Sequence, residues 1–252
     1  MTPLSCTYRV LRDASEVALC AAHQVESAAH RAIERAGRFT LVLAGGSSPR
    51  PAYELISARG RMDWERVHIF WSDERCVPPA DAASNYRMAG DTLFARAAPP
   101  RGNIHRIPAE RGGVEAAAHY DDELATFFGA RQPGLLALPA FDLVLLGVGD
   151  DGHTASLFPG GPGLTSPSWT APARAPAGVE PAERVTLTLA AIAAAAEVSF
   201  IVTGAAKQEM VAQILAQQQS DHPAARVTAQ QRVRWFLDRE SGGSLRNPAA
   251  GA

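Results

Sequence analysis

Acid and base side chains gather in one short stretch near the middle of the chain. An apolar run at residues 141–146 is followed by a Gly-Val-Gly turn and then by Asp150, Asp151 and His153. A neutral imidazole can take a proton from water near neutral pH, and a neighbouring carboxylate can hold the other ring nitrogen. Asp151 is the nearest candidate for that carboxylate. These residues predict a site that activates water for hydrolysis.

Three other apolar runs also end in residues that could bind a charged ligand. They are followed by Gly45-Gly46-Ser47, by the charged residues Asp73 to Arg75, and by a glycine turn with Lys207. A strand that leads through glycines into a helix offers free N–H groups to an anion. The turn at Gly45-Gly46-Ser47 is neither a P-loop nor a GxGxxG motif. A lone Lys207 is typical of a surface, although a lysine at a helix start would also suit an anion.

The elements that must position these residues alternate along the chain. Apolar runs predict strands at 8–11, 39–44, 67–71, 103–107, 141–146, 184–188, 198–202 and 233–237. Periodicity and capping signals predict helices at 15–36, 51–57, 84–93, 114–128, 154–158 and 190–195. Alternation of this kind favours an α/β fold with a mostly parallel sheet covered by helices. The ligand would then lie at the carboxyl ends of the strands.

The segments outside this pattern carry further expectations. The proline-rich stretch 160–181 is long for a loop in a compact domain, which is typical of a lid or a binding loop. The acidic residues of the helix at 114–128 are expected to form a solvated face. The tail 241–252 is expected to fray. Because no linker divides the chain, we expect residues 1–252 to form a single domain.

Composition limits the kinds of partner. The net charge of -2 over 252 residues gives no reason to expect nucleic acid or an anionic membrane. We see neither a signal peptide nor an apolar run that could span a membrane. Cys6, Cys20 and Cys76 lack metal-ligand spacing and fit a reducing cytoplasm. We expect a cytoplasmic monomer without a metal, and a spectator role for Cys76 in preference to a reactive thiol.

Several motifs in a fixed order make the sequence specific. It reads LAGGSSPRPAYELI from Leu43, WSDERCVP from Trp71, SNYRMA from Ser84, GVGDDGHTASLFPG from Gly147, RVTLTL from Arg184 and GAAKQ from Gly204. This set resembles the 6-phosphogluconolactonase family, which is related in fold to glucosamine-6-phosphate deaminases. The resemblance covers roughly residues 9–238. GDDGHTASLFPG carries most of its specificity, and the glycine motifs add order and spacing.

The resemblance implies a fold, an activity and a set of site residues. The fold would be Rossmann-like. The activity would be hydrolysis of 6-phospho-D-glucono-1,5-lactone, the second step of the oxidative pentose phosphate pathway, with no organic cofactor. The catalytic histidine would be His153, assisted by Asp151. The substrate-binding candidates are Gly45, Gly46, Ser47, Asp73, Arg75, Asn85, Arg184 and Lys207. How Asp73, Asp150 and Asp151 divide their roles stays open.

Two alternatives compete with a lactonase. An amino-sugar phosphate deaminase or isomerase of the same fold would need a carboxylate where this chain has Phe158. A sugar-phosphate sensing domain would need a DNA-binding segment, and no spare stretch of this sequence predicts one. A covalent serine mechanism is not indicated, because Ser156 lies in no GxSxG elbow.

Overall fold

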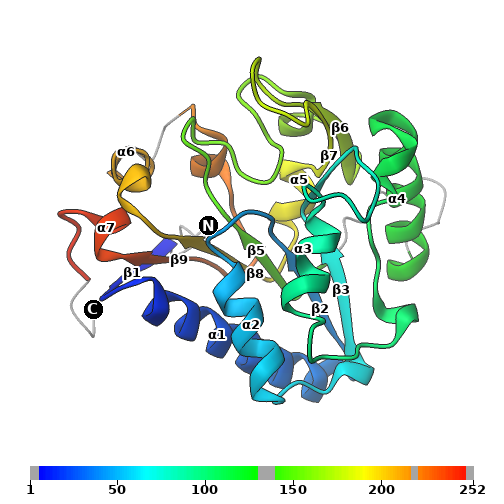
Figure 1. Cartoon of the computed structure of the whole chain (residues 1–252), viewed down its shortest axis with the longest axis horizontal. Helices are drawn as coiled ribbons and strands as arrows, with labels where there is room; N and C mark the ends of the chain where they lie inside the picture. The colour runs from blue at the N-terminus through cyan, green and yellow to red at the C-terminus, as the bar shows by residue number, and fades with distance from the viewer. Residues whose placement is uncertain (1–5, 130–139, 217–220, 248–252) are drawn as a thin grey trace.

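The structure is a computed structural model that describes residues 6–129, 140–216 and 221–247. Its centre is a six-stranded parallel sheet in the order β1-β9-β8-β5-β2-β3 (Figure 1). The strands are β1 (Cys6–Leu11), β2 (Phe39–Leu43), β3 (Val67–Trp71), β5 (Leu143–Leu146), β8 (Glu197–Val202) and β9 (Arg232–Asp238). The expected parallel α/β fold is confirmed.

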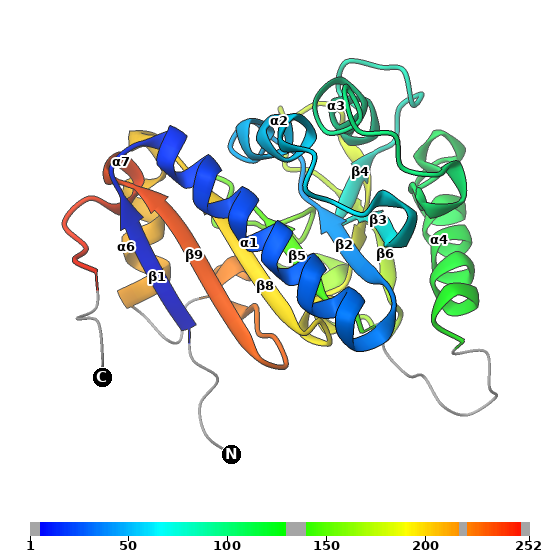
Figure 2. The same ribbon diagram turned by 90° about the horizontal axis from the view of Figure 1, so that it is seen from below.

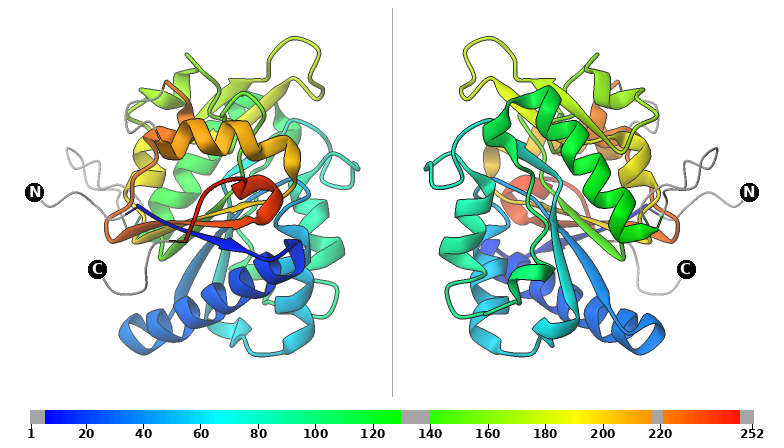
Figure 3. Two further views of the ribbon diagram at one scale, coloured as in Figure 1. Left: turned by 90° about the vertical axis from the view of Figure 1, so that its left-hand side faces the viewer. Right: turned by 90° about the vertical axis from the view of Figure 1, so that its right-hand side faces the viewer.

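Helices cover both faces of this sheet. The main ones are α1 (Ala14–Ala36), α2 (Arg50–Arg59), α3 (Asn85–Thr92), α4 (Gly113–Phe128) and α6 (Gln208–Ala216), with the short α5 (Leu189–Ala193) and α7 (Arg239–Gly242). Helix α1 crosses one face of β9 and β8 (Figure 2), and α6 lies on the opposite side (Figure 3). None of the helices in the described ranges is long and apolar enough to span a membrane.

The strands form where apolar residues can be buried on both sides. Every residue of β2, β5 and β8 is buried, as expected for parallel strands covered by helices. The one polar interruption that the sequence showed, Asp142, lies just before β5. Its carboxylate accepts hydrogen bonds from the backbone and hydroxyl of Thr40 at 2.9 and 2.8 Å, and pairs with Arg35.

A second, antiparallel sheet was not predicted. It contains β4 (Asp73–Arg75), β7 (Glu183–Leu187) and β6 (Thr170–Arg174), in the order β4-β7-β6. Helix α4 packs beside it (Figure 1, upper right). Asp121 of α4 accepts hydrogen bonds from the backbone and hydroxyl of Thr170, so this position is not part of a solvated face.

Three other expectations need correction. Residues 103–107 form no strand, since only Ile104 makes an isolated bridge to Ile69. Residues 154–158 form a tight turn instead of a helix, with Ala155 at a positive φ of 49°. The segment from Ser241 does not fray at its start, because Ser241 is buried and donates to the carbonyl of Val202. Residues 248–252 of the tail lie outside the described ranges.

The strand order reverses between β2 and β5. From β2 the sheet continues to β3 on one side, and from β5 it continues through β8 to β9 on the other. The loops after β2 and β5 therefore diverge from a common point, where parallel α/β sheets place their ligands.

Candidate functional site

A cavity of about 600 Å³ lies at this reversal point. Nine of the ten predicted site residues line it, from loops that are far apart in the sequence. They are Gly45, Gly46, Ser47, Asp73, Arg75, Asp151, His153, Arg184 and Lys207. Asn85 is 1% exposed and is not among the lining residues.

His153 is held by Asp151 from two directions. Its backbone N–H and its Nδ1 both contact Asp151 Oδ1, at 3.0 and 2.5 Å. Burial alone would raise the pKa of Asp151, but hydrogen bonds from His153 outweigh it and hold that pKa below its usual value. An ionised Asp151 accepts a hydrogen bond from Nδ1–H, so the lone pair of a neutral His153 lies on Nε2.

A tight turn gives this histidine its place. Gly149 N–H donates to the carbonyl of His153 at 2.8 Å, and the hydroxyl of Thr154 donates to the carbonyl of Gly147. A Cβ on Gly149 would lie 2.0 Å from His153 Nδ1. The ring therefore occupies space that only a glycine leaves free.

Phe158 and Ser156 follow on the same segment. Phe158 lines the cavity, and its ring centroid lies 4.7 Å from that of His153. Ser156 is 2% exposed, and its hydroxyl donates to Asp73 at 2.7 Å. A hydroxyl committed in this way gives no support to a covalent serine mechanism.

Two arginines lie next to each other on adjacent strands of the small sheet. Arg75 of β4 pairs in register with Arg184 of β7, and both line the cavity. Neither forms an ion pair with any residue in the described ranges, and the buried Nε of Arg75 has no hydrogen-bond partner there. Burial first, and then Arg75, lower the pKa of Arg184. Asp73 and Glu74 oppose this shift from a distance. Two guanidinium groups without a direct ion pair favour binding of an anion.

Asn85 supports the site from behind. Its side-chain amide donates to the carbonyl of Asp73 at 2.9 Å. A Cβ on Gly45 would meet the Asn85 side chain at 2.2 Å, so the two residues pack in direct contact. Asn85 thus contacts two residues of the cavity wall from its buried side.

Lys207 reaches the cavity from the end of β8. It ends a 3-10 turn at Ala205–Lys207, and α6 begins at the next residue. Its Nζ lies 2.5 Å from Asp150 Oδ1. The preceding Gly204 has a φ of 94°, and its N–H donates to Asp238 at the end of β9. This contact of Asp238 was not predicted from the sequence.

The proline-rich stretch also contributes to the cavity. Residues 170–174 form strand β6, and Pro176 and Val179 in the turn after it line the cavity. The stretch 160–181 therefore reaches the cavity at this tip, and its role as a binding loop or lid stays a prediction. Ser48 and Ser72 also line the cavity and were not singled out in the sequence.

Cys76 has the chemistry of a spectator. Burial first, and then the nearby Glu183 and Glu74, raise the pKa of its thiol to about 11. A thiol with that pKa is almost entirely protonated at neutral pH, which argues against nucleophilic reactivity.

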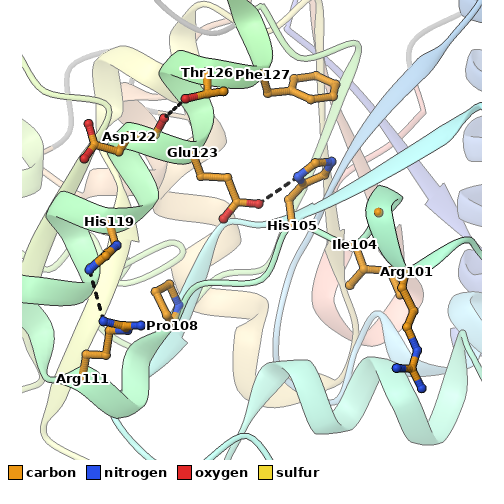
Figure 4. A pocket seen from close by; sticks show the side chains of 11 residues that line it. Arg101, Ile104, His105, Pro108, Arg111, His119, Asp122, Glu123, Thr126 and Phe127 are labelled. Carbon is orange, nitrogen blue, oxygen red and sulfur yellow. Dashed lines mark hydrogen bonds and ion pairs between the residues drawn. The ribbon is translucent and has the colours of Figure 1, made fainter.

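A second cleft, of about 680 Å³, lies between α4 and the segment 101–111 (Figure 4). There His105 pairs with Glu123 at 2.9 Å and with His68 at 3.1 Å, and Arg111 contacts His119. Both ring nitrogens of His105 are therefore engaged by neighbouring side chains. Within the described ranges, no group of three His, Cys, Asp or Glu residues could hold a metal ion.

Known proteins share both this sequence and this fold. The profile of the family described as glucosamine-6-phosphate isomerases/6-phosphogluconolactonase matches residues 12–235. A 6-phosphogluconolactonase from Synechocystis is 41% identical over 219 residues, covering 86% of this chain and 88% of that protein. One from Nostoc is 40% identical over 217 residues, covering 85% and 88%.

A solved structure agrees with these relatives. The crystal structure of a 6-phosphogluconolactonase from Thermotoga maritima has a TM-score of 0.80 and 29% identity, and the match covers 93% of this chain and 100% of that one. Residues 12–235, which match the family profile, contain every residue that lines the cavity. The chain therefore belongs to the family of glucosamine-6-phosphate isomerases and 6-phosphogluconolactonases.

Proposed function

We propose that this protein is a 6-phosphogluconolactonase, which hydrolyses 6-phospho-D-glucono-1,5-lactone to 6-phospho-D-gluconate in the oxidative pentose phosphate pathway. The observation that carries this proposal is one cavity in which an Asp151-oriented His153 lies with three cationic side chains. His153 can activate the water that attacks the lactone carbonyl, and the cationic side chains can bind the phosphate. The curated relatives bear the same name.

His153 serves as the general base in this proposal. Nε2 takes a proton from a water molecule, whose oxygen attacks the lactone carbonyl carbon. Asp151 stabilises the imidazolium that forms. Collapse of the tetrahedral intermediate breaks the bond to the ring oxygen, which takes the proton from His153. Arg75 or N–H groups of the glycine turns face the developing oxyanion.

The remaining positive groups bind the phosphate. Arg184 and Lys207 carry fixed charge into the cavity, and Gly46 and Ser47 lie in the turn that precedes α2. A turn at a helix N-terminus offers N–H groups to an anion. Asp73 and Asn85 act by positioning, since Asp73 holds Ser156 and Asn85 packs against Gly45.

Replacement of His153 tests the activity and the role of this residue together. The wild type should accelerate lactone loss far above the spontaneous rate, and His153→Ala should lower kcat by about 10²- to 10⁴-fold. Base release during hydrolysis of freshly generated lactone measures both. Near-normal kcat in the variant would remove His153 from the mechanism, and a wild type no faster than buffer would refute the lactonase proposal.

The second candidate function, amino-sugar phosphate deamination, meets an obstacle at Phe158. An apolar ring lies beside His153 where that chemistry would want a carboxylate. We therefore expect no ammonia above background from glucosamine 6-phosphate in a coupled glutamate dehydrogenase assay. Release at about 1 per second or faster, an ordinary enzymatic rate, would favour the deaminase instead.

We also propose that the protein acts as a cytoplasmic monomer. The support for the location is its composition, with three cysteines that lack metal-ligand spacing and fit a reducing compartment. Cell fractionation and sedimentation equilibrium test the location and the oligomeric state separately.

A further inference from the structure

The ammonium group of Lys207 forms an ion pair with a neighbouring side chain in the cavity. Its Nζ contacts Asp150 Oδ1 at 2.5 Å, and both residues line the cavity wall. The two side chains differ in their surroundings. Lys207 is 24% exposed, whereas Asp150 is 80% exposed. Lys207 therefore gains more from having a partner than Asp150 does.

The Asp150 carboxylate has a single partner in the described part of the chain. Among the residues of the described ranges, only Lys207 forms a hydrogen bond or ion pair with its carboxylate. The other two carboxylates that line the cavity accept hydrogen bonds from different residues. Asp151 accepts from the backbone and ring of His153, and Asp73 accepts from Ser156. Asp150 is thus the one acid there that can leave its partner without breaking a second contact.

We propose that Asp150 is a positioning residue: it holds Lys207 in the cavity when the site is empty and yields it to a phosphate. This inference rests on the proposed function, in which Lys207 binds the substrate phosphate. An exposed ion pair contributes little stability, so it exchanges readily. A phosphate dianion offers more charge and more acceptor oxygens than one carboxylate.

The exchange lowers the affinity of the empty site for anions. A ligand must replace the carboxylate before it gains the lysine, so Asp150 weakens the binding of each anion that uses Lys207 by a similar factor. An uncharged sugar gains nothing from the exchange, and Asp150 does not affect its binding. Asp150 therefore moderates phosphate binding while it keeps the Lys207 ammonium within the cavity.

A mutant cycle with inorganic phosphate as the probe tests this inference. Titration calorimetry at low ionic strength gives Kd for the wild type, Asp150→Asn, Lys207→Ala and the double variant. Asp150→Asn should bind phosphate about two- to fivefold more tightly, which corresponds to the strength of an exposed ion pair. In the Lys207→Ala background the same change should leave Kd unaltered. Asp63→Asn, which removes an equal charge ahead of β3, is the matched control.

Each outcome decides the question. Unchanged or weaker phosphate binding by Asp150→Asn overturns the proposal. Equal tightening with and without Lys207 also overturns it, because the effect would then be general charge repulsion. Kinetics add a second readout: Asp150→Asn should lower KM for the phosphorylated lactone and leave KM for unphosphorylated gluconolactone unchanged. Because phosphate binding is measured without turnover, an inactive wild type would refute the lactonase proposal and leave this cycle interpretable.

Discussion

The ring of His153 fills the space beside the Cα of Gly149, and this contact decides how the base is presented. The backbone of Gly149 does not adopt the left-handed conformation that favours glycine, so the glycine is required for space and not for conformation. The turn is fixed from the other side as well, because Ala224 N–H donates to the carbonyl of Gly152. A larger residue at 149 would therefore move the ring and not the turn.

We expect Gly149→Ala to lose most of its activity while it stays folded. The new methyl group would displace His153 from Asp151, and misplacement of a base by about 1 Å costs roughly 100-fold in rate. Steady-state kinetics should show a fall in kcat with little change in KM. The melting temperature, followed by circular dichroism, should stay close to that of the wild type.

Gly90→Ala is the matched control, since nothing lies within 4 Å of a Cβ at that helical position. This variant should keep full activity and melt no earlier than the wild type, because alanine favours helix. Full activity in Gly149→Ala would show that His153 tolerates a different position.

Local contacts of the site could be predicted from the sequence, and distant ones could not. Asp151 and His153 are two residues apart, so their pairing follows from the turn that joins them. Lys207 and Asp150 are 57 positions apart, and Asn85 meets Gly45 only after α3 packs beside α2 and β4. Such pairings depend on tertiary packing, which no short motif encodes.

At the scale of elements, helix α3 begins at a buried carboxylate. Glu74 accepts hydrogen bonds from the N–H groups of Asn85 and Tyr86 and from the hydroxyl of Ser84. Burial raises the pKa of Glu74 although these hydrogen bonds oppose the shift. Burial of the Glu74 carboxylate costs desolvation free energy, but the carboxylate provides hydrogen-bond acceptors for the N–H groups in the first turn of α3.

We expect Glu74→Ala to destabilise the protein by about 1–3 kcal/mol, because the N–H groups of the first turn lose their buried acceptor. Urea unfolding followed by tryptophan fluorescence measures the change. Glu54→Ala, an exposed acid on α2, should stay within about 0.5 kcal/mol of the wild type. Equal stability of the Glu74 variant would mean that water replaces the carboxylate.

The long apolar strands could be predicted because burial on both faces leaves a continuous run of hydrophobic residues. Residues 67–71 were predicted with the bounds that the structure has. Strand β6 was mostly missed because its sequence, TAPAR, contains Pro172, which a strand tolerates at a sheet edge. The turn at 154–158 was predicted as helix because a five-residue segment carries too little periodicity to distinguish the two.

Across the whole molecule, stability should depend on pH through His68. Burial first, and then His105 and Arg38, lower the pKa of this residue to about 4. In the unfolded chain its pKa is about 6.5. Between these values the unfolded state binds a proton that the folded state does not, so stability rises with pH across this window.

We therefore expect His68→Gln to flatten the dependence of unfolding free energy on pH between about 4 and 6.5. The wild type should lose His68's share of its stability as pH falls through that window, and the variant should lose less. Urea titrations at several pH values measure both slopes. His30→Gln, at a side chain that is 76% exposed, should keep the wild-type slope. Parallel curves for His68→Gln and the wild type would show that His68 titrates normally.

The two sheets contribute different parts of the cavity. The loops of the parallel sheet carry the base and Lys207, and the small sheet carries Asp73, Arg75 and Arg184. The turn after β6 supplies only Pro176 and Val179. That turn is joined to the rest by the β6–β7 ladder and by Asp121, and it touches neither Asp151 nor His153 through any hydrogen bond in the described ranges. Evolution can therefore change the length or the side chains of this turn, and with them the sugars that the cavity admits. The two residues that act on the ester bond, Asp151 and His153, keep their positions.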